Sequence, residues 1–302
     1  MRNSKLRLFA LALAVFAMVA AACGDEPEPE PSAPSGTGSD TTSPAAEPDL
    51  LARIQADGVI RVATDQKYKP QSWYDTKTGE WKGFDVEVAQ EVASRLGVEA
   101  EIAHQEWDLV TAGSWNDRWD MNVGSMTVTL ERSSIFSFSP AYYYTPASIA
   151  VNGENTSIQD ITTDLDGKKI CVGSSTTYES FLEQQLNIPG YSFDYVIDDP
   201  QIITYATDTD ALDNLALGDG VRCDAAMTAT PTIDQFIADG GAVKNVGEPL
   251  YGEPLAIAFD TSSPIDNASL VAAVSTIIEE MHADGTLTAL SMKWYGEDIT
   301  QV

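Results

Sequence analysis

Short runs rich in β-branched and aromatic residues alternate with longer segments of helical periodicity from Val59 onwards. Parallel strands need a crossover connection of a dozen or more residues, usually a helix, so this order is typical of α/β units with mostly parallel sheets. The same order begins again after residue 155. The sequence therefore predicts an α/β protein made of two similar units that are not identical repeats.

The first unit contains a segment with clear helical periodicity at 85–97. Its apolar residues fall on one face, so we predict a helix that Asp85 caps and Gly97 ends. The other predicted elements are strands over 58–64, 98–105 and 119–126, a hairpin over 74–84 with its turn at Gly79, and a short helix or irregular segment over 108–117.

The second unit repeats this pattern, and the chain ends in helices. We predict strands over 168–173, 192–198, 223–229 and 253–260, and helices over 176–186 and 209–220. The segment 267–285 carries an apolar stripe formed by Leu270, Val274, Ile277, Ile278 and Met281, which indicates a helix packed on the core. A shorter helix over 286–296 follows.

The N-terminus has the pattern of an export signal. Three basic residues precede an apolar run from Leu8 to Ala22 that is short for a membrane span, so we assign residues 1–22 to a signal peptide. The "AAACG" that follows resembles the lipobox of bacterial lipoproteins, in which the cysteine, here Cys23, is acylated. Ala20 stands where leucine is usual, and ordinary cleavage after Ala-x-Ala is the alternative.

Residues 23–49 are predicted to form a tether, because "DEPEPEPSAPSGTGSDTTSPAAEP" is rich in Pro, Ser, Thr and acidic residues and cannot bury a core. The chain has 17 basic and 46 acidic residues, and three of the basic residues lie in the signal. The strongly negative remainder makes nucleic acid and anionic lipid unlikely partners.

Two cysteines, Cys171 and Cys223, remain beyond the lipobox. An exported setting permits a disulfide between them, and a pair of reduced buried thiols is the alternative. The two histidines, His104 and His282, stand alone in the sequence with no ligand spacing around them. We therefore predict no metal site and no cofactor.

The stretch "GSMTVTLER" places Arg132 after several hydroxyl residues and ahead of an aromatic segment. An arginine side chain is a planar fork of donors that matches a carboxylate, and Ser125, Thr127 and Thr129 offer further donors. This pattern indicates an anion receptor. A surface arginine at a strand end is the alternative from the residues alone.

Three segments resemble motifs of the extracellular solute-binding proteins of family 3, the polar-amino-acid receptors of bacterial ATP-driven importers. They are "KGFDVEVAQEVASRLG", "VGSMTVTLERSSIFSFSPAYYYT" and "DGTLTALSMKWYG", and the resemblance spans residues 57–296. It implies a two-lobed periplasmic-binding-protein-like fold of type II with two hinge strands, which would cross between the lobes near "TPASIAV" and "GEPLAIA". One lobe would comprise 50–147 with 255–302, and the other 148–254.

The resemblance also implies a binding site for an amino-acid head group. Arg132 matches the carboxylate-binding arginine, and Gly124, Ser125 and Thr127 match the adjacent ligand strand. Thr177 matches a helix start that completes the carboxylate site, with a plain N-cap as the alternative, and Tyr178 follows it.

The side chain of the ligand would lie between aromatic residues. Tyr68 and Trp107 match the positions that sandwich it, and core packing is the alternative, above all for Trp107. Asp65 matches a position that helps to bind the cation of basic amino acids, with a solvated turn carboxylate as the alternative.

One position departs from the family pattern. The carboxylate that pairs with the ligand's ammonium is expected five residues after Asp224, where this chain has Ala229. Burying an ammonium without a partner is costly. Either Asp65, Glu179 or Asp234 takes over, or the ligand is not an ordinary α-amino acid.

The function implied is a monomeric, lipid-anchored receptor on the outer face of the bacterial cell membrane. It would capture a small carboxylate-bearing solute, in particular an amino acid, by closing its cleft, and present it to an ABC permease without changing it covalently. One alternative is an exported enzyme similar to cyclohexadienyl or arogenate dehydratase, with Glu179 or Glu106 as general acid. Another is a ligand-sensing module, although the chain has no transmembrane helix after the domain.

Overall fold

The computed structural model describes residues 49–301. The predicted signal peptide, Cys23 and nearly all of the predicted tether lie outside these residues. Asp49 lies within the predicted tether, but in the structure it caps helix α1 (Leu50–Asp57), since its Oδ1 accepts a hydrogen bond from the Ala52 N–H at 2.9 Å. Asp49 therefore belongs to the first helix and not to the predicted tether.

Within residues 49–301, nine strands form one mixed sheet and three more form a small separate sheet. The large sheet has the order β10-β9-β11-β8-β12-β6-β1-β5, with β7 beside β12. Its strands are β1 (Val59–Thr64), β5 (Glu99–His104), β6 (Met121–Thr127), β7 (Phe136–Phe138), β8 (Tyr143–Asn152), β9 (Lys169–Gly173), β10 (Gln201–Tyr205), β11 (Ala225–Ala229) and β12 (Val243–Asp260). The small sheet contains β2 (Lys67–Tyr68), β3 (Ser72–Asp75) and β4 (Glu80–Lys82).

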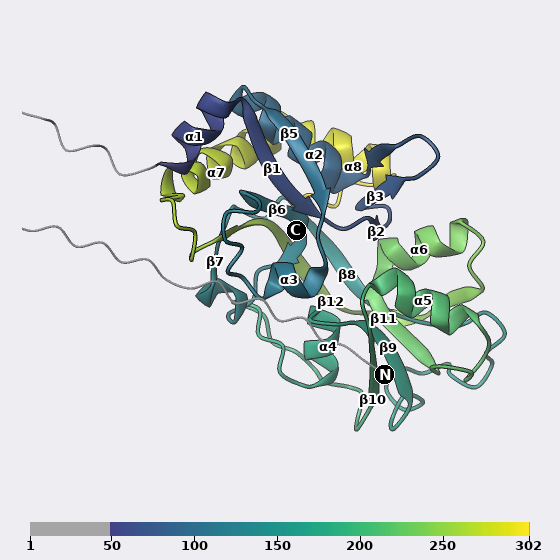
Figure 1. Ribbon diagram of the computed structural model, residues 1–302. Coiled ribbons are helices and arrows are strands. Elements are labelled where there is room, and N and C mark those ends of the chain that lie inside the picture. The colour runs from purple at the N-terminus through teal and green to yellow at the C-terminus, as the bar shows by residue number, and fades with distance from the viewer. Residues whose placement is uncertain (1–48, 302) are drawn as a thin grey trace, which may run out of the picture. The chain divides into compact units, whose positions relative to one another are not determined.

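The helices cover the faces of the large sheet, as expected of an α/β fold (Figure 1). They are α2 (Phe84–Leu96), α3 (Trp107–Thr111), α4 (Thr177–Leu182), α5 (Asp208–Ala216), α6 (Thr230–Ala238), α7 (Ala268–Ala283) and α8 (Thr286–Tyr295). The turn η1 (Arg132–Ser134) follows β6. Helix α2 packs on β1, β5 and β6, whereas α5 packs on β9 and β11.

Two long antiparallel strands, β8 and β12, connect the two halves of the sheet (Figure 1). The first part of β12 pairs with β8, and its last residues pair with β6 and β7. β8 in turn pairs with β11 on its other side. The expected hinge segments "TPASIAV" and "GEPLAIA" lie in these two strands.

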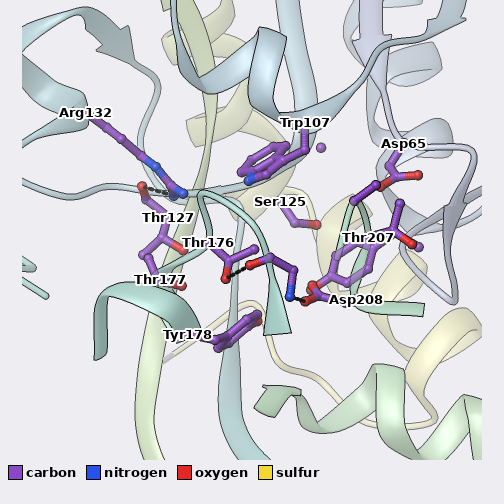
Figure 2. A pocket seen from close by; sticks show the side chains of 14 residues that line it. Asp65, Trp107, Ser125, Thr127, Arg132, Thr176, Thr177, Tyr178, Thr207 and Asp208 are labelled. Atoms are coloured by element: carbon purple, nitrogen blue, oxygen red, sulfur yellow. Dashed lines mark hydrogen bonds between the residues drawn. The ribbon is translucent and has the colours of Figure 1, made fainter. Parts of the chain in front are cut away.

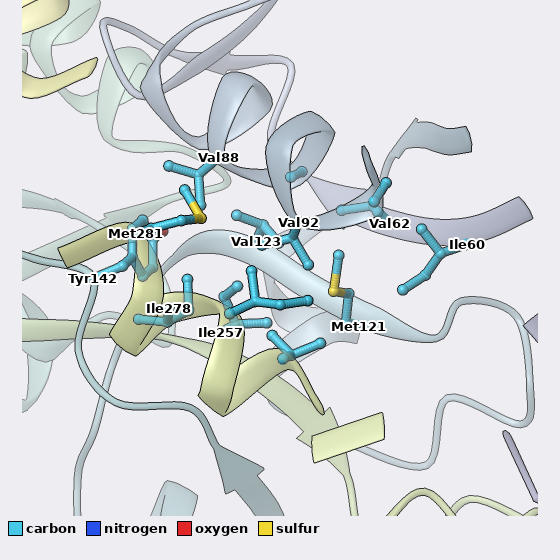
Figure 3. Packing of buried hydrophobic residues seen from close by; sticks show 14 of the residues in the cluster. Ile60, Val62, Val88, Val92, Met121, Val123, Tyr142, Ile257, Ile278 and Met281 are labelled. Carbon is cyan, nitrogen blue, oxygen red and sulfur yellow. The ribbon is translucent and has the colours of Figure 1, made fainter. Parts of the chain in front are cut away.

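The buried apolar residues also divide between the halves. One large cluster joins α2, α7 and α8 to β1 and β6, where Val88 and Val92 face Val123 and Ile278 (Figure 3). A smaller cluster around Trp115 lies in the same half. The other two clusters contain buried residues from 147 to 243 only. The predicted lobe boundaries, 50–147 with 255–302 and 148–254, stay a prediction, and Ala147 packs with the second set of residues.

Most predicted elements match the structure, including the hairpin β3–β4 with Gly79 at its turn, and α7 with its apolar stripe buried. The strand predicted at 192–198 is wrong. The chain there is extended, and Phe193, Tyr195 and Ile197 pack on an apolar cluster, but the strand that pairs with β9 is β10, at Gln201–Tyr205. Alternating apolar residues can be buried without joining a sheet ladder.

The predicted role of Asp85 as a helix cap is also wrong. The N-cap of α2 is Gly83, and Asp85 lies in the first turn with its side chain fully buried. Its Oδ2 accepts from the Ser125 hydroxyl at 2.6 Å and its Oδ1 from the Tyr142 hydroxyl at 2.7 Å. Asp85 therefore ties α2 to the strand β6 that carries part of the site.

Cys171 of β9 and Cys223 form a disulfide, with their sulfur atoms 2.06 Å apart. Both cysteines are buried in the cluster between β9, β11 and α5, so the bond lies inside the second half of the fold. Between residues 49 and 301, no helix is both long and apolar enough to cross a membrane. The same residues contain no group of three or more His, Cys, Asp and Glu side chains arranged to hold a metal ion.

Candidate functional site

A cavity lies among β2, α3, β6, α4, α5 and the segments beside them (Figure 2). All nine predicted ligand-binding residues line it: Asp65, Tyr68, Trp107, Gly124, Ser125, Thr127, Arg132, Thr177 and Tyr178. Sequence reasoning missed the other five lining residues, which are Gly173, Thr176, Ala206, Thr207 and Asp208. The cavity combines aromatic walls with a few polar groups, as small-molecule sites do.

Arg132 is buried and points along one wall of the cavity (Figure 2). It is only 8% exposed, which rules out the surface-arginine alternative. Its Nη1 donates to the Thr127 carbonyl at 3.2 Å and its Nη2 to the Ser175 carbonyl at 2.9 Å. Burial lowers its pKa from the usual value. Since a guanidinium has five N–H donors and these carbonyls accept from two, donors remain for an anion in the cavity.

Trp107 packs against this arginine. The guanidinium carbon lies 5.3 Å from the centre of its ring, and the indole N–H donates to the same Ser175 carbonyl at 3.1 Å. Ser175 presents this carbonyl from a left-handed backbone conformation, with φ at 58°. The aromatic ring and the carbonyl together hold the guanidinium in place.

Glu253 of β12 contacts two residues that line the cavity, and sequence reasoning missed it. It is 1% exposed, and its Oε1 accepts from the Thr127 hydroxyl at 2.8 Å and from the Thr177 hydroxyl. Burial raises its pKa, although these hydroxyls and Arg132 oppose that change. Because both hydroxyls are bonded to Glu253, the backbone N–H groups of Thr127 and Thr177 are the better candidates for contacting a ligand.

The Ser125 hydroxyl is also already bonded to protein groups. Its Oγ is bonded to Asp85 and lies 2.5 Å from the Tyr143 hydroxyl. The residue has a φ of 56°, a left-handed conformation that is uncommon outside glycine. Its bonds to Asp85 and Tyr143 support this conformation, so we assign Ser125 to shaping the strand at the cavity.

The start of α4 is capped by Thr176 rather than by Thr177. The Thr176 Oγ1 accepts from the Glu179 N–H at 3.2 Å and donates to the Gly173 carbonyl at 2.7 Å. The alternative of Thr177 as a plain N-cap is therefore wrong. Thr177 is the first residue of the helix, and its side chain bonds to Glu253.

Two carboxylates, Asp65 and Asp208, lie at the other end of the cavity from Arg132 (Figure 2). The Asp65 Oδ1 accepts from the Lys67 N–H at 2.7 Å, and burial raises the pKa of Asp65. Burial also raises the pKa of Asp208, to about 7, although the Gly173 N–H donates to its Oδ1 at 3.1 Å. The cavity therefore has a positive end and an acidic end.

The structure reduces the number of residues that could supply the carboxylate missing at position 229. Ala229 is fully buried in an apolar cluster. Glu179 accepts from the Ser175 N–H at 2.6 Å and Asp234 accepts from the Asn245 amide at 2.7 Å, and neither is among the residues that line the cavity. Of the three candidates, the cavity contains Asp65 only.

The residues 60–297 match the family model described as bacterial extracellular solute-binding proteins, family 3. The chain is 31% identical over 257 residues to the L-cystine-binding protein TcyJ of Escherichia coli, and the match covers 85% of this chain and 90% of that protein.

Two solved structures of reconstructed ancestral proteins are also similar. An ancestral arginine-binding protein bound to arginine has a TM-score of 0.67 and 28% identity, covering 79% of this chain and 99% of that one. The ancestral amino acid-binding protein AncCDT-1, a precursor of cyclohexadienyl dehydratase, has a TM-score of 0.68 and 29% identity, covering 81% of this chain and 99% of that one. The two-lobed type II fold is thereby confirmed, and this chain belongs to the bacterial extracellular solute-binding proteins of family 3.

Proposed function

We propose that this protein is the extracytoplasmic receptor of an ABC importer and that it binds an amino acid in the cavity between Arg132 and the acidic end. The main observation in support is that the Arg132 guanidinium is buried and has donors left for a carboxylate. The L-cystine-binding and arginine-binding relatives support an amino acid as the class of ligand.

In this proposal the α-carboxylate of the ligand binds Arg132 and the N–H groups at Thr127 and Thr177. A charge-assisted bidentate contact is strong in a partly dry cleft. Tyr68 and Trp107 contact the ligand's side chain, and Tyr178 closes the floor of the cavity. These roles rest on the positions of the residues around one cavity and on the family resemblance.

Closure of two lobes is the proposed means of capture. Several contacts join the two halves around the cavity, including those of Arg132 and Trp107 with Ser175. Lys67 and Lys69 of the first half pair with Asp210 at 3.1 Å and Asp239 at 2.7 Å in the second. A ligand that contacts both halves would shift the population toward this closed arrangement.

The proposed setting is the outer face of the cell membrane. The basic and apolar pattern of residues 1–22 supports export, and "AAACG" supports lipidation of Cys23. We propose that the acidic tether holds a monomeric receptor near its permease. Incorporation of labelled palmitate in the wild type, and its loss in Cys23→Ser, tests the anchor. Equal labelling of the two proteins would contradict it.

An enzyme on the same scaffold is the second candidate, because a dehydratase precursor is among the similar structures. Neither Glu106 nor Glu179, the carboxylates nominated as general acids, is among the residues lining the cavity. This observation favours the receptor. Turnover of an aromatic amino-acid precursor, followed by absorbance, would favour the enzyme instead.

A thermal-shift screen tests the proposed function. The purified domain is mixed with the standard amino acids, L-cystine, their decarboxylated relatives and small organic acids. A ligand that binds only the folded state raises the unfolding temperature by mass action. We expect amino acids to stabilise the protein and amines without a carboxylate to leave it unchanged. Stabilisation by the amines alone would contradict the proposal.

A further inference from the structure

Asp208 is a buried carboxylate that lines the cavity and was absent from the sequence-based candidates. It is the first residue of α5, directly after the N-cap Thr207, and is 8% exposed. Its Oδ1 accepts from the Gly173 N–H at 3.1 Å. The helix start and β9 therefore fix the position of this carboxylate.

Among residues 49–301, Asp208 has no basic side chain within 4.0 Å. Asp210, two residues further along the same helix, is paired with Lys67 at 3.1 Å. A buried carboxylate is costly when it is ionised without a partner, and this cost is visible in its pKa, which burial raises to about 7. A cation in the cavity would remove that cost.

The position of Asp208 also suits a replacement for the ammonium-binding carboxylate that is missing at Ala229. The Gly173 N–H that bonds to Asp208 is at the end of β9, and β9 runs parallel to β11, the strand that ends at Ala229. The Asp208 carboxylate therefore lies near the end of β11, where the last residue, Ala229, has no carboxylate. Asp65 is the other acid in the cavity, but its side chain is less buried than that of Asp208.

We propose that Asp208 binds the ammonium group of the ligand, in place of a carboxylate at position 229. This inference rests on the proposed function, since it assumes that a ligand carboxylate binds at Arg132. The ammonium has three N–H donors, and Asp208 supplies a charged acceptor in the same cavity as Arg132. With Asp65 beside it, the cavity offers two carboxylates to one arginine, which disfavours dicarboxylate ligands.

Calorimetry with pairs of ligands tests this inference. L-arginine, L-lysine and L-glutamine are compared at pH 8 with their analogues that lack only the α-ammonium: 5-guanidinopentanoate, 6-aminohexanoate and 4-carbamoylbutanoate. The tightest-binding amino acid and its analogue are then measured with Asp208→Asn. We expect the variant to lose about 10- to 100-fold in affinity for the amino acid and to change little for the analogue.

Asp213→Asn is the matched control, because Asp213 lies on the exposed side of the same helix and is not a lining residue of the cavity. It should bind as the wild type does. Asp208→Ser, which keeps a residue suited to a helix start, is the second variant if Asp208→Asn unfolds. Thermal unfolding of each variant checks that it is folded.

The inference is overturned if folded Asp208→Asn discriminates between amino acid and analogue as strongly as the wild type. It is also overturned if Asp65→Asn alone abolishes the discrimination, or if the wild type binds both ligands equally. In these three cases the receptor function and the Arg132 site still stand. If the wild type binds no amino acid, the proposed function fails, and the ammonium site fails with it.

Discussion

Arg132 donates a hydrogen bond of 2.9 Å across the cleft to the carbonyl oxygen of Ser175. The arginine follows β6 in the first half of the fold, and Ser175 precedes α4 in the second. The residue proposed to bind the ligand's carboxylate is therefore also a contact between the halves. In the proposed mechanism, ligand binding and closure of the cleft would both depend on the Arg132 side chain.

Glu253 should be needed for stability more than for binding. Glu253→Ala would leave the buried hydroxyls of Thr127 and Thr177 without their acceptor, which costs about 1 to 3 kcal/mol in the free energy of unfolding. Glu253→Gln keeps an acceptor oxygen and should cost less. Urea unfolding of the three proteins measures this difference. Equal stability of Glu253→Ala and the wild type would contradict the assigned role.

The disulfide should stabilise the second half without affecting the site. It closes a loop with a sequence separation of 52, so the double variant Cys171→Ser with Cys223→Ser should lose about 2 to 4 kcal/mol of unfolding free energy. Neither cysteine lines the cavity. Ligand affinity of the folded variant, measured by calorimetry, should therefore match the wild type, and a large loss of affinity would contradict this assignment.

Ligand affinity should depend on pH through Asp208. Burial raises its pKa to about 7 in the free protein, and Asp65 and Glu253 add negative charge nearby. Only the ionised form can neutralise an ammonium, so affinity should fall below pH 7, by at most about tenfold per pH unit. Calorimetry between pH 5.5 and 8 measures the slope, and Asp208→Asn should flatten it. An equal slope in both proteins would assign the effect to another group.

The same carboxyl group should make the free protein less stable as the pH rises. Its pKa is near 7 in the folded state and 3.8 in the reference state, so between these values the folded protein binds more protons than the unfolded chain. Its contribution to stability is present below pH 4 and is lost by pH 7. The stability of Asp208→Asn relative to the wild type should therefore increase over this range in urea titrations. A constant difference would contradict the assigned pKa.

Local sequence patterns predicted those helices and strands whose apolar residues are buried and whose end residues cap them. The helix α2 ends at Gly97, which has a left-handed φ of 77°, and the stripe of α7 is buried as its spacing predicts. β12 shows the limit of such patterns. The prediction covered 253–260, but the strand begins at Val243, because a register shift between Val246 and Tyr251 accommodates Gly247 and Pro249.

The acidic residues of the site could not be ranked from sequence. Asp208, Asp210 and Asp213 occur in one short segment and look alike, yet only Asp208 is buried and lines the cavity. In the sequence, Glu253 likewise has no feature that distinguishes it from a surface glutamate beside a proline. The fate of each carboxylate depends on what distant segments place around it, namely Gly173 for Asp208 and Thr127 for Glu253. No local spacing carries that information.

The affinity of Arg132→Ala for the amino acid identified by screening is the most direct test of the proposed carboxylate site. Arg222→Ala removes an exposed arginine elsewhere and is the matched control. We expect calorimetry to show a loss of about 100-fold or more in Arg132→Ala, since a buried charge-assisted contact is lost, and no change in Arg222→Ala. A folded Arg132→Ala that binds the amino acid as tightly as the wild type would show that the carboxylate binds elsewhere.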